Sequence, residues 1–433
     1  MTPGADGRVD YAARGDEVRM GIGLSSMGFV LAGLGACTAI LARDLDEPTS
    51  RLALLSSGLA AGLLFVALVG PRLLRSWPIT TVLAVGSVIC AVGTVLLAVA
   101  PVYAVAIAGG LCIGLGGALL VLVAPLMLDG PTAAARLSRV NAVASGTGIL
   151  APLAIGALDS LGPTGRLALL AAAPPLLVLA VLTRRVKPVP QSSEPAALVL
   201  IDSAPAVGLG RKWLGRRSGA RRRVGRQVAA AVGLGWLRIV LAVAVEFCFV
   251  VWAVARLVAT GLPTATAALL GSAFPIGMAI GRAIGPVHWR SWSPVVPSAV
   301  LAVVGTLLVS LFDAPAVVAA GLVVAGAGVA PLYPITLAAL VATPGLSPAR
   351  LAAIGAMASG TAILVAPAAL AVLARVVDLR TAYLITLPLL AALFALSRRP
   401  RTSPAESLGR DNLHLRREPD GPRAVDGLAP HVD

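Results

Sequence analysis

A single acidic residue, Glu246, stands at the middle of an apolar segment that runs from residue 235 to residue 258. A charge at the centre of a bilayer costs about 2.5–3.5 kcal/mol on insertion scales, and intramembrane acids mark ion or proton pathways by default. Desolvation favours the neutral form of an isolated carboxyl, which can load a proton on one side and release it on the other. We therefore predict that Glu246 is a proton-coupling or cation-binding group. A structural carboxyl, hydrogen-bonded to a neighbouring helix, is the alternative.

Three arginines are candidate partners for Glu246. Arg238 and Arg256 lie nearer the ends of the same segment. Long basic side chains in such positions can extend to the membrane interface, so both are able to snorkel. Arg282 lies deeper in its own apolar segment, 264–284, and can pair with Glu246 in one conformational state.

A short phrase of small residues occurs twice, as ASGTGIL at 144–150 and ASGTAIL at 358–364. Ten of sixteen positions are identical between 135–150 and 349–364. Arg, Ser and Trp recur in a second pair of matching segments at nearly the same offset, GPRLLRSW from Gly70 and GPVHWRSW from Gly285. The chain is therefore duplicated, with a period far longer than the roughly 20–50 residues of solenoid repeats.

The first copy of the phrase places Asn141, Ser145, Gly148 and Pro152 on one stripe of a helix. The matching stripe of the second copy contains Ser359. Small residues let helices approach closely, and hydroxyl groups can bond across the gap. We predict Ser145 and Ser359 as substrate contacts or, equally, as packing residues, and we expect the amide of Asn141 to need a polar partner.

The composition is that of a membrane protein. Mean hydropathy is +0.90, and 13% of residues are charged, whereas soluble domains carry about 25%. Backbone groups in lipid must pair within their own segment, and a spanning helix needs about 20 mostly apolar residues. The sequence therefore predicts an all-α polytopic membrane protein. The expected spans are 20–42, 52–70, 79–99, 102–128, 140–158 and 166–183, then 235–258, 264–284, 294–312, 315–340, 352–374 and 380–397.

The formal net charge of +15 is concentrated in the connections between spans. Basic clusters follow every second span, and this alternation follows the positive-inside rule, so both termini and the middle segment are expected to be cytoplasmic. Residues 184–226 hold eleven Lys and Arg against two acids. Because no nucleic-acid module accompanies them, we interpret the stretch 211–226 as one held against anionic lipid, at about 1 kcal/mol per basic residue.

Five regions are expected along the chain: a cytoplasmic tail, a six-helix half, a basic cytoplasmic linker, a second six-helix half and a disordered cytoplasmic tail. They are 1–19, 20–183, 184–234, 235–397 and 398–433.

The sequence contains no catalytic or cofactor signature. Its three histidines lie in a loop and in the C-terminal tail, and its four cysteines are scattered through the expected spans. A GxxxxGK nucleotide loop is absent as well. An integral-membrane enzyme, a metal site and ATP-driven transport by this chain are disfavoured, and we expect no cofactor.

Two six-helix halves, a basic middle segment and paired loop motifs resemble the major facilitator superfamily over about residues 20–397. Members of this family carry a glycine, an acid and several basic residues between helices two and three. Neither copy of the motif here has the acid that supports a conformational latch in the family. The gating residues implied by the resemblance are Gly70, Arg72 and Arg75, with Gly281, Arg282 and Arg290 in the second half.

Exporters of the family often carry a glycine-proline motif in helix five. The equivalent here runs from Gly148 to Gly156, with Ala151 in place of the glycine before Pro152. Pro367 is expected as the corresponding kink of helix eleven. The stretches AVEFCFVVWA and GVAPLYPITLA are similar to helices seven and ten of bacterial members, and the strong preference for arginine over lysine is typical of an actinobacterial genome. The resemblance implies export and a place in the bacterial plasma (inner) membrane.

In the family, helices one, four, seven and ten surround a central cavity. The lining that the resemblance implies here is mostly apolar, which suits a small apolar or amphipathic solute. Trp252 is interpreted as a stacking residue or as a membrane-interface anchor. The predicted substrate-binding residues, besides Asn141, Ser145 and Ser359, are Ser26, Thr38, Phe247, Trp252, Tyr333 and Thr336.

These expectations combine into a secondary active transporter that exports a small solute in exchange for protons by alternating access. Its expected partners are the solute, protons and a bilayer with anionic lipid at the cytoplasmic face, and no nucleic acid. An importer of a small metabolite is one alternative. A non-transporting sensor or assembly partner built on a transporter fold is another.

Overall fold

In this computed structural model, every regular element of the described residues is a helix. Ten helices or helix pairs are long and apolar enough to cross a membrane, and the two shorter apolar helices Leu55–Gly70 and Val295–Leu311 complete the set. The expected all-α polytopic architecture with twelve spans is confirmed. The structure describes residues 5–47, 54–128, 133–162, 165–184, 214–285, 293, 295–346 and 348–397.

The first six spans form one half. Its first helix begins well before residue 20, so much of the expected N-terminal tail is helical. Its sixth span starts as a 3₁₀ helix and continues as an α-helix. The elements are α1 (Ala5–Asp44), α3 (Leu54–Ser76), α4 (Ile79–Val99), α5 (Tyr103–Met127), α6 (Ala133–Leu161), η1 (Gly165–Ala172) and α7 (Ala173–Arg184).

The last six spans form the second half. Its first helix begins at Leu214, inside the expected linker. Residues 185–213 of that linker and the C-terminal tail 398–433 lie outside the described residues. The elements are α9 (Leu214–Val258), α10 (Thr264–Gly271), α11 (Ala273–Ile284), α12 (Val295–Leu311), α13 (Pro315–Val329), α14 (Leu332–Val341), α15 (Pro348–Leu373), α16 (Leu379–Ala382), η2 (Tyr383–Ile385) and α17 (Thr386–Ser397).

Two spans of the second half are interrupted just before prolines. The eighth span breaks at Ser272, between α10 and α11, and the tenth breaks after Val329, between α13 and α14. Proline has no N–H to donate to the carbonyl four residues earlier. Pro275 and Pro334 therefore leave carbonyls without their helical partners at these two breaks.

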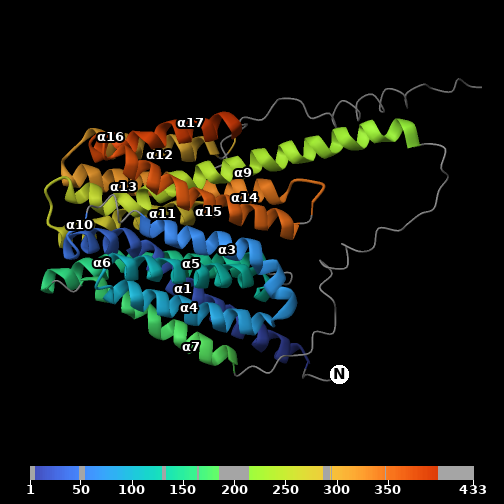
Figure 1. The fold of residues 1–433 in the computed structure, drawn as a ribbon, viewed down its shortest axis with the longest axis horizontal. Coiled ribbons are helices and arrows are strands. Elements are labelled where there is room, and N and C mark those ends of the chain that lie inside the picture. The colour runs from blue at the N-terminus through green and yellow to red at the C-terminus, as the bar shows by residue number, and fades with distance from the viewer. Residues whose placement is uncertain are drawn as a thin grey trace, which may run out of the picture. The chain divides into compact units, whose positions relative to one another are not determined.

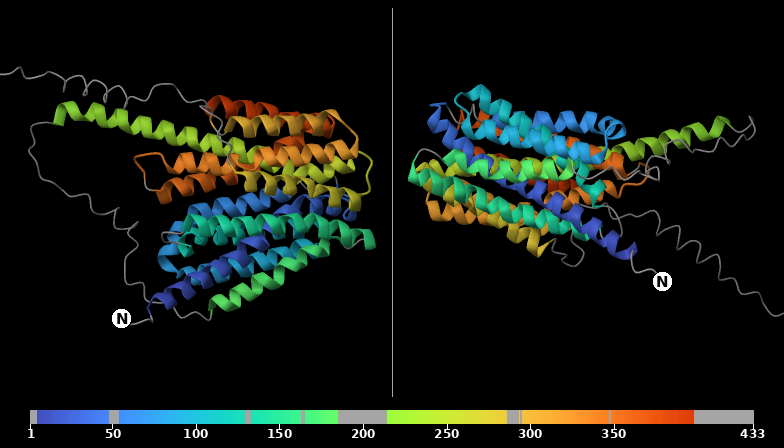
Figure 2. Two further views of the ribbon diagram at one scale, coloured as in Figure 1. Left: turned by 180° about the vertical axis from the view of Figure 1, so that it is seen from behind. Right: turned by 90° about the horizontal axis from the view of Figure 1, so that it is seen from below.

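The two halves lie side by side, the first drawn in blue to green and the second in yellow-green to red (Figure 1), and the other two views agree (Figure 2). The N-terminus and the start of α9 lie at the same end of the bundle, which we call the terminal end. The connections near Asp44, Asp159 and Asp313 lie at the other end, which we call the loop end. Across the halves, α1 packs against α9, α3 against α15, and α6 against α10 and α11.

The helix that carries Glu246 is central to the bundle. Within its most apolar stretch, 72% of α9 is buried, against 33% for α6. Helices of both halves contact α9, namely α1 of the first half and α10, α11, α13, α14, α15 and α17 of the second. Glu246 is therefore surrounded by protein and is 17% exposed.

Candidate functional site

Glu246, Arg282 and Ser145 meet between the two halves. Arg282 Nη1 donates a hydrogen bond to Ser145 Oγ at 2.6 Å, and Arg282 Nη2 lies 3.8 Å from Glu246 Oε1. Ser145 belongs to α6 in the first half, whereas Glu246 and Arg282 belong to α9 and α11 in the second. The structure thus contains the pairing of Glu246 with Arg282 that the sequence left open.

Ser145 can receive this hydrogen bond because its own proton is already directed elsewhere. Its hydroxyl donates to the carbonyl of Asn141, one turn earlier in α6, at 2.8 Å. A hydroxyl that donates once still offers oxygen lone pairs to a donor. Ser145 therefore accepts a hydrogen bond from Arg282 and holds one edge of the guanidinium against α6.

Tyr333 on α14 and Ser359 on α15 extend the arrangement in the second half. Tyr333 lies beside Ser359 and within electrostatic range of Glu246. Ser359 donates to the carbonyl of Gly355 at 3.1 Å. Five helices therefore contribute to one polar cluster. Its members are Ser145, Glu246, Arg282, Tyr333 and Ser359.

The repeated phrase of the sequence supplies one serine to each side of the polar cluster. Ser145 and Ser359 occupy the same position in the two copies and come from opposite halves. The charged residues have no such counterpart. At the offset that relates the two serines, Glu246 corresponds to Ala32 in the first half. The charge of the polar cluster is therefore supplied by the second half alone.

The pair of Glu246 and Arg282 is loose. Its 3.8 Å separation is longer than a hydrogen bond, and the Arg282 side chain is 41% exposed. A guanidinium has five N–H donors, of which Ser145 takes one. Within the part of the chain that the structure describes, Glu246 accepts no hydrogen bond. Charge attraction alone holds this pair, so it can open without the loss of a hydrogen bond.

Three of the predicted substrate-binding hydroxyls bond to their own helices. Ser26, Thr38 and Thr336 are buried, and each donates to the carbonyl four residues earlier, at 2.9, 2.7 and 2.8 Å. A hydroxyl of this kind can still accept a hydrogen bond, although its proton is already used. Their substrate-binding role stays a prediction.

Trp252 lies inside the bundle. Its Nε1 donates to the carbonyl of Pro367 at 3.3 Å, and the side chain is 3% exposed. The alternative of a membrane-interface anchor is therefore wrong for Trp252, because its polar tip bonds to α15. Phe247 is buried as well. The side chain of Asn141 is exposed, and in the contacts at Ser145 only its backbone carbonyl takes part.

The predicted gating prolines lie within continuous helices. Pro152 and Pro367 are buried inside α6 and α15. Gly148, one turn before Pro152, faces α1, where an added Cβ would lie 3.3 Å from Ala32 Cβ. Gly148 therefore packs against a helix of its own half.

The gating residues of the two loop motifs are only partly described. Gly70 packs against α5 and Gly281 against α13, each inside its own half. Arg72 is exposed at the end of α3. The Arg75 side chain and the whole of Arg290 lie outside the described residues. Of the predicted gating residues, Arg282 is the one that the structure places at the polar cluster.

Glycines bring the two halves together toward the loop end. An added Cβ on Gly156 would lie 2.7 Å from the backbone nitrogen of Leu269. Level with the polar cluster, one on Gly360 would lie 2.8 Å from the Leu64 side chain of α3. Gly35 of α1 abuts the carbonyl of Val250 in α9. Cβ atoms do not approach other atoms this closely, so only glycine permits these helix crossings. In this conformation the halves are pressed together on the loop-end side of the polar cluster.

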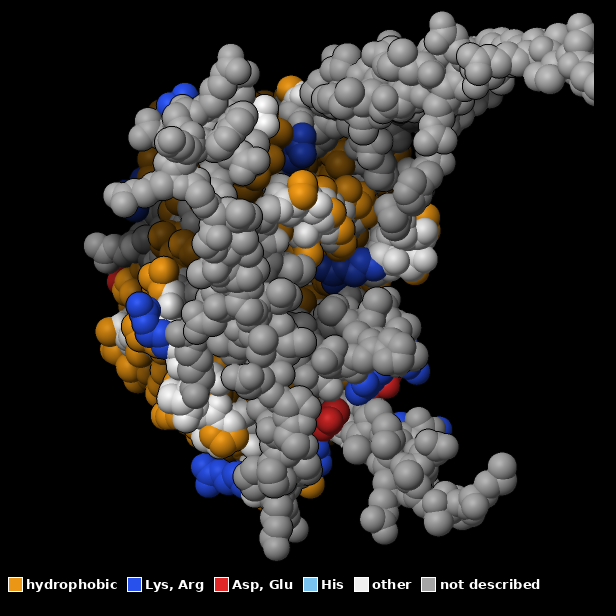
Figure 3. Space-filling view, turned by 90° about the vertical axis from the view of Figure 1, so that its right-hand side faces the viewer, with side chains coloured by type: hydrophobic (Ala, Val, Ile, Leu, Met, Phe, Trp, Pro, Cys, Tyr) orange, Lys and Arg blue, Asp and Glu red, His pale blue; other side chains and the backbone are white. Residues whose placement is uncertain are grey.

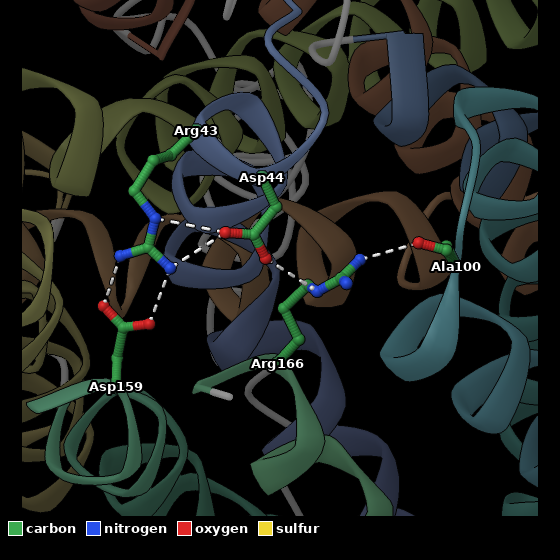
Figure 4. Close-up of polar contacts among 5 residues, drawn as sticks. All are labelled: Arg43, Asp44, Ala100, Asp159 and Arg166. Atoms are coloured by element: carbon green, nitrogen blue, oxygen red, sulfur yellow. Dashed lines mark hydrogen bonds and ion pairs between the residues drawn. The ribbon is translucent and has the colours of Figure 1, made fainter. Parts of the chain in front are cut away.

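A network of charges fastens the first half at the loop end (Figure 4). Arg43 donates to both oxygens of Asp159 at 2.8 and 2.9 Å and also bonds to Asp44. Arg166 Nε lies 3.0 Å from Asp44 Oδ2, and its Nη1 donates to the carbonyl of Ala100 at 2.8 Å. The network therefore ties the ends of α1, α4, α6 and η1 into one unit.

An equivalent network fastens the second half. Arg256 is 1% exposed and donates to the carbonyls of Val309 and Phe312 at 3.0 and 2.6 Å and to Asp313 at 2.8 Å. Arg380 pairs with the second oxygen of Asp313. Hydrogen bonding from Arg256, with the charge of Arg380, holds the pKa of Asp313 below its usual range. Arg256 does not snorkel, because carbonyls at the end of α12 and Asp313 satisfy its donors inside the half.

Each half thus has two arginines joined by one aspartate at the loop end, an arrangement we call the Arg–Asp–Arg bridge. Arg166 and Arg380 occupy equivalent positions at the offset that relates Ser145 to Ser359. That recurrence of an arginine at the same offset is a signal that the sequence itself carries. Both bridges stay within their own halves, so they stiffen each half and make no contact across the seam between the halves.

Other polar and sulfur-containing side chains take structural positions. Arg238 Nε donates to the carbonyl of Leu396 at 3.0 Å, so it joins α9 to the terminal end of α17. Cys37, Cys90 and Cys248 are free and buried. Within the described residues, no three His, Cys, Asp or Glu side chains are grouped so as to hold a metal ion.

No protein-family model matches the chain, and no curated protein sequence matches it. Solved structures do. A D-xylose-proton symporter is 13% identical with a TM-score of 0.66, covering 88% of this chain and 96% of the symporter. A bacterial homolog of the human lysosomal transporter Spinster, inward-facing and unoccupied, is 13% identical with a TM-score of 0.65, covering 89% of this chain and 96% of that one.

The major facilitator superfamily transporter FucP, in its outward conformation, is 17% identical with a TM-score of 0.54 and is covered completely by 89% of this chain. At such identities the likeness establishes the fold. The chain has the twelve-helix, two-half fold of polytopic membrane transporters. That fold is the major facilitator fold.

Proposed function

We propose that this chain is a secondary active transporter that moves a small apolar or amphipathic solute across the bacterial plasma (inner) membrane by alternating access. Glu246 carries the coupled proton. The observation that supports this best is the loose pair of Glu246 and Arg282, which lies at the seam of two halves with a transporter fold. An acid inside a membrane protein that has an incomplete set of partners is a candidate proton carrier.

The proposed cycle follows from which contacts cross the seam. Glycine-mediated packing closes the seam on its loop-end side, and the hydrogen bond from Arg282 to Ser145 crosses it at the polar cluster. Rocking of the halves exchanges these contacts, while the Arg–Asp–Arg bridges keep each half rigid. When Glu246 gains a proton, it loses its attraction for Arg282, and the balance between conformations shifts.

The terminal end is the proposed cytoplasmic face, so both termini are cytoplasmic. Lys and Arg side chains are more frequent than Asp and Glu on this end of the molecule (Figure 3). Positive charge is retained on the cytoplasmic side of membrane proteins. The basic segment 211–226 that precedes and begins α9 is proposed to bind anionic lipid on the same face.

The direction of transport has two candidates. The Gly148–Gly156 stretch of α6 favours export in exchange for protons, as in exporters that carry a related motif. Uptake together with protons is the alternative, because the similar solved structures include proteins named as proton symporters for D-xylose and fucose. A sensor or assembly partner that transports nothing is the remaining possibility for this fold.

A growth panel tests the proposal without a known substrate. A bacterial host that lacks its main efflux pumps would produce wild type, Glu246→Gln or the matched control Glu17→Gln, a half-buried acid outside the polar cluster. The proposal is supported if wild type and the control alter the tolerance of the host to some compounds, and if Glu246→Gln at equal membrane expression does not. Greater tolerance indicates export and lower tolerance indicates uptake. Equal effects of all three proteins would remove Glu246 from the mechanism.

A further inference from the structure

We propose that Arg282 binds an anionic group of the solute, so that the substrate class is a small amphipathic organic acid that binds together with a proton. The inference rests on the proposed function, because it assigns a substrate class to the same polar cluster. It also goes further, because it makes the transported solute a carboxylate or a similar monoanion.

Arg282 has the position and the unused donors that such a site requires. Its guanidinium contacts α6 of one half and α9 of the other, so it lies in the seam, and its side chain is 41% exposed there. One of its five donors bonds to Ser145. A planar guanidinium with free donors matches a carboxylate through two parallel hydrogen bonds.

The other internal arginines of the second half are already occupied. Arg256 is buried and bonds to two carbonyls and Asp313. Arg238 bonds to the carbonyl of Leu396. Arg282 is thus the cation of this half, within the described spans, that combines exposure in the seam with unused hydrogen-bonding capacity.

Glu246 makes the binding of acid and proton interdependent. The ionised carboxyl of Glu246 attracts Arg282 and competes with an incoming carboxylate for it. Protonation of Glu246 removes this competitor, and the groups that face Glu246 in the described residues are Arg282 and Tyr333. Tyr333 is neutral across the physiological range as an ordinary phenol. One proton and one monoanion then enter the site together and carry no net charge across the bilayer, where unpaired charge is costly.

This order of binding favours symport over exchange. In an exchanger the proton and the solute must compete for the same state, whereas here each one promotes the binding of the other. The uptake alternative therefore gains support over the export that the Gly148–Gly156 stretch favours.

The test is thermal stabilisation of the purified full-length chain by matched pairs of compounds. Each pair consists of a small aromatic or aliphatic carboxylate and its primary amide, because the two differ in charge and hardly in shape. A ligand that binds the folded state raises the melting temperature according to its affinity. Wild type is compared with Arg282→Gln, Glu246→Gln and the control Arg139→Gln, which removes a 66% exposed arginine from α6.

We expect carboxylates, and not their amides, to stabilise wild type and Arg139→Gln, with tighter binding at mildly acidic than at mildly alkaline pH. Arg282→Gln should weaken binding by about tenfold or more, as the loss of a charge-assisted pair does. Glu246→Gln should bind at both pH values as tightly as wild type does under acid conditions. This last variant keeps the test decisive should Arg282→Gln fail to fold.

The inference is overturned when amides stabilise as well as acids, when Arg282→Gln keeps wild-type affinity, or when no carboxylate of the panel stabilises wild type. If acids bind in a way that depends on Arg282 but not on pH or on Glu246, the claim of an anion site stands and the claim that a proton binds with the anion is overturned. Because no transport is measured, failure of the proposed transport function is seen separately, in the growth panel.

Discussion

Charged side chains inside this bundle belong to two kinds. Arg256 and Asp313 are joined by hydrogen bonds and a second arginine, and they serve as fixed structure. Glu246 and Arg282 face each other at 3.8 Å, with few other partners, and they can change state. Separating a pair that is held by hydrogen bonds loses those bonds, whereas a 3.8 Å pair with a 41% exposed arginine opens at little cost. The structure therefore distinguishes charges that stabilise the fold from the pair of Glu246 and Arg282, which can change its contacts.

Asp313 should make the stability of the protein depend on acid pH. Its pKa is lowered in the folded state by Arg256 and Arg380. A group with a lowered folded pKa contributes stability that is full above its unfolded pKa, about 3.9 for aspartate, and that is lost as pH falls through the folded value. We predict that acidification below about pH 4 lowers the melting temperature of wild type more than that of Asp313→Asn.

The matched control for this prediction is Asp378→Asn. Asp378 is exposed at the same end of the bundle, and its side chain does not cap α16. Thermal melts of detergent-purified protein across the acid range provide the measurement. Parallel curves for wild type and Asp313→Asn would show that the second Arg–Asp–Arg bridge contributes nothing that depends on pH.

At the level of single residues, the sequence indicated the candidate pair of charges better than the contacts of the structural side chains around it. A lone acid in an apolar segment is conspicuous in a sequence, so Glu246 and an arginine of a nearby span, Arg282, could be proposed as a pair, and the structure places them 3.8 Å apart. Arg256 was misjudged because its distance from the span end indicates reach to the interface, but says nothing of the carbonyls exposed at the end of α12. Contacts between distant segments, such as Trp252 with Pro367, have no signal in one sequence.

Helices in this protein cross where glycine removes the side chain. Gly156 lets α6 touch the backbone of α10, and Gly360 lets α15 touch α3. Both crossings join the two halves. Close backbone approach through small residues is a principal source of helix association in membranes. The closed loop-end side of the seam therefore depends on a few glycines, and their substitution should affect one conformation more than the other.

Gly156→Ala should disturb this closure. An added Cβ at Gly156 would lie 2.7 Å from the Leu269 nitrogen, so α6 and α10 must separate. Overpacking of this kind costs about 1–3 kcal/mol. We predict a lower melting temperature and a loss of the compound-specific growth effect. Gly146→Ala is the control on the same helix, since nothing lies within 4 Å of a Cβ there. Equal behaviour of the two variants would contradict the proposed role of this crossing.

The helix count and order were predictable from the sequence, whereas helix ends and breaks were less so. Hydropathy sets the number of spans because each must cover the same hydrocarbon thickness. Prolines are tolerated within α6 and α15 but break the spans near Pro275 and Pro334. The outcome depends on whether neighbouring helices satisfy the freed carbonyls, which a single sequence does not reveal.

The described chain up to Ser397 consists of two similar halves, each braced internally by charges and packed against the other mainly through apolar helix contacts. Their bracing is duplicated, as Arg166 and Arg380 show, but their charge at the seam is not. Duplication explains the symmetric fold, and divergence of one half explains a single charged pair. The proposed alternating access requires this combination, namely two rigid halves and, between them, one site whose contacts change with its protonation.

Topology provides a test at this scale. We predict that a reporter active only in the cytoplasm will work when fused after Arg184 or after Ser397, which end the sixth and twelfth spans at the terminal end. The same reporter inserted after Leu161, at the loop end, should be inactive. A reporter active only outside the cytoplasm should show the opposite pattern. Activity at the loop end would reverse the proposed orientation.

Proton movement in proteoliposomes is the most direct measurement of the coupling assigned to Glu246. A pH-sensitive dye inside the vesicles would follow protons after addition of a compound identified by the growth panel, with radiolabelled exchange measured in parallel. We predict that wild type moves protons with the compound, and that Glu246→Gln still exchanges the compound but moves no protons. Equal proton movement by both proteins, or compound-driven transport by wild type without protons, would contradict the coupling role of Glu246.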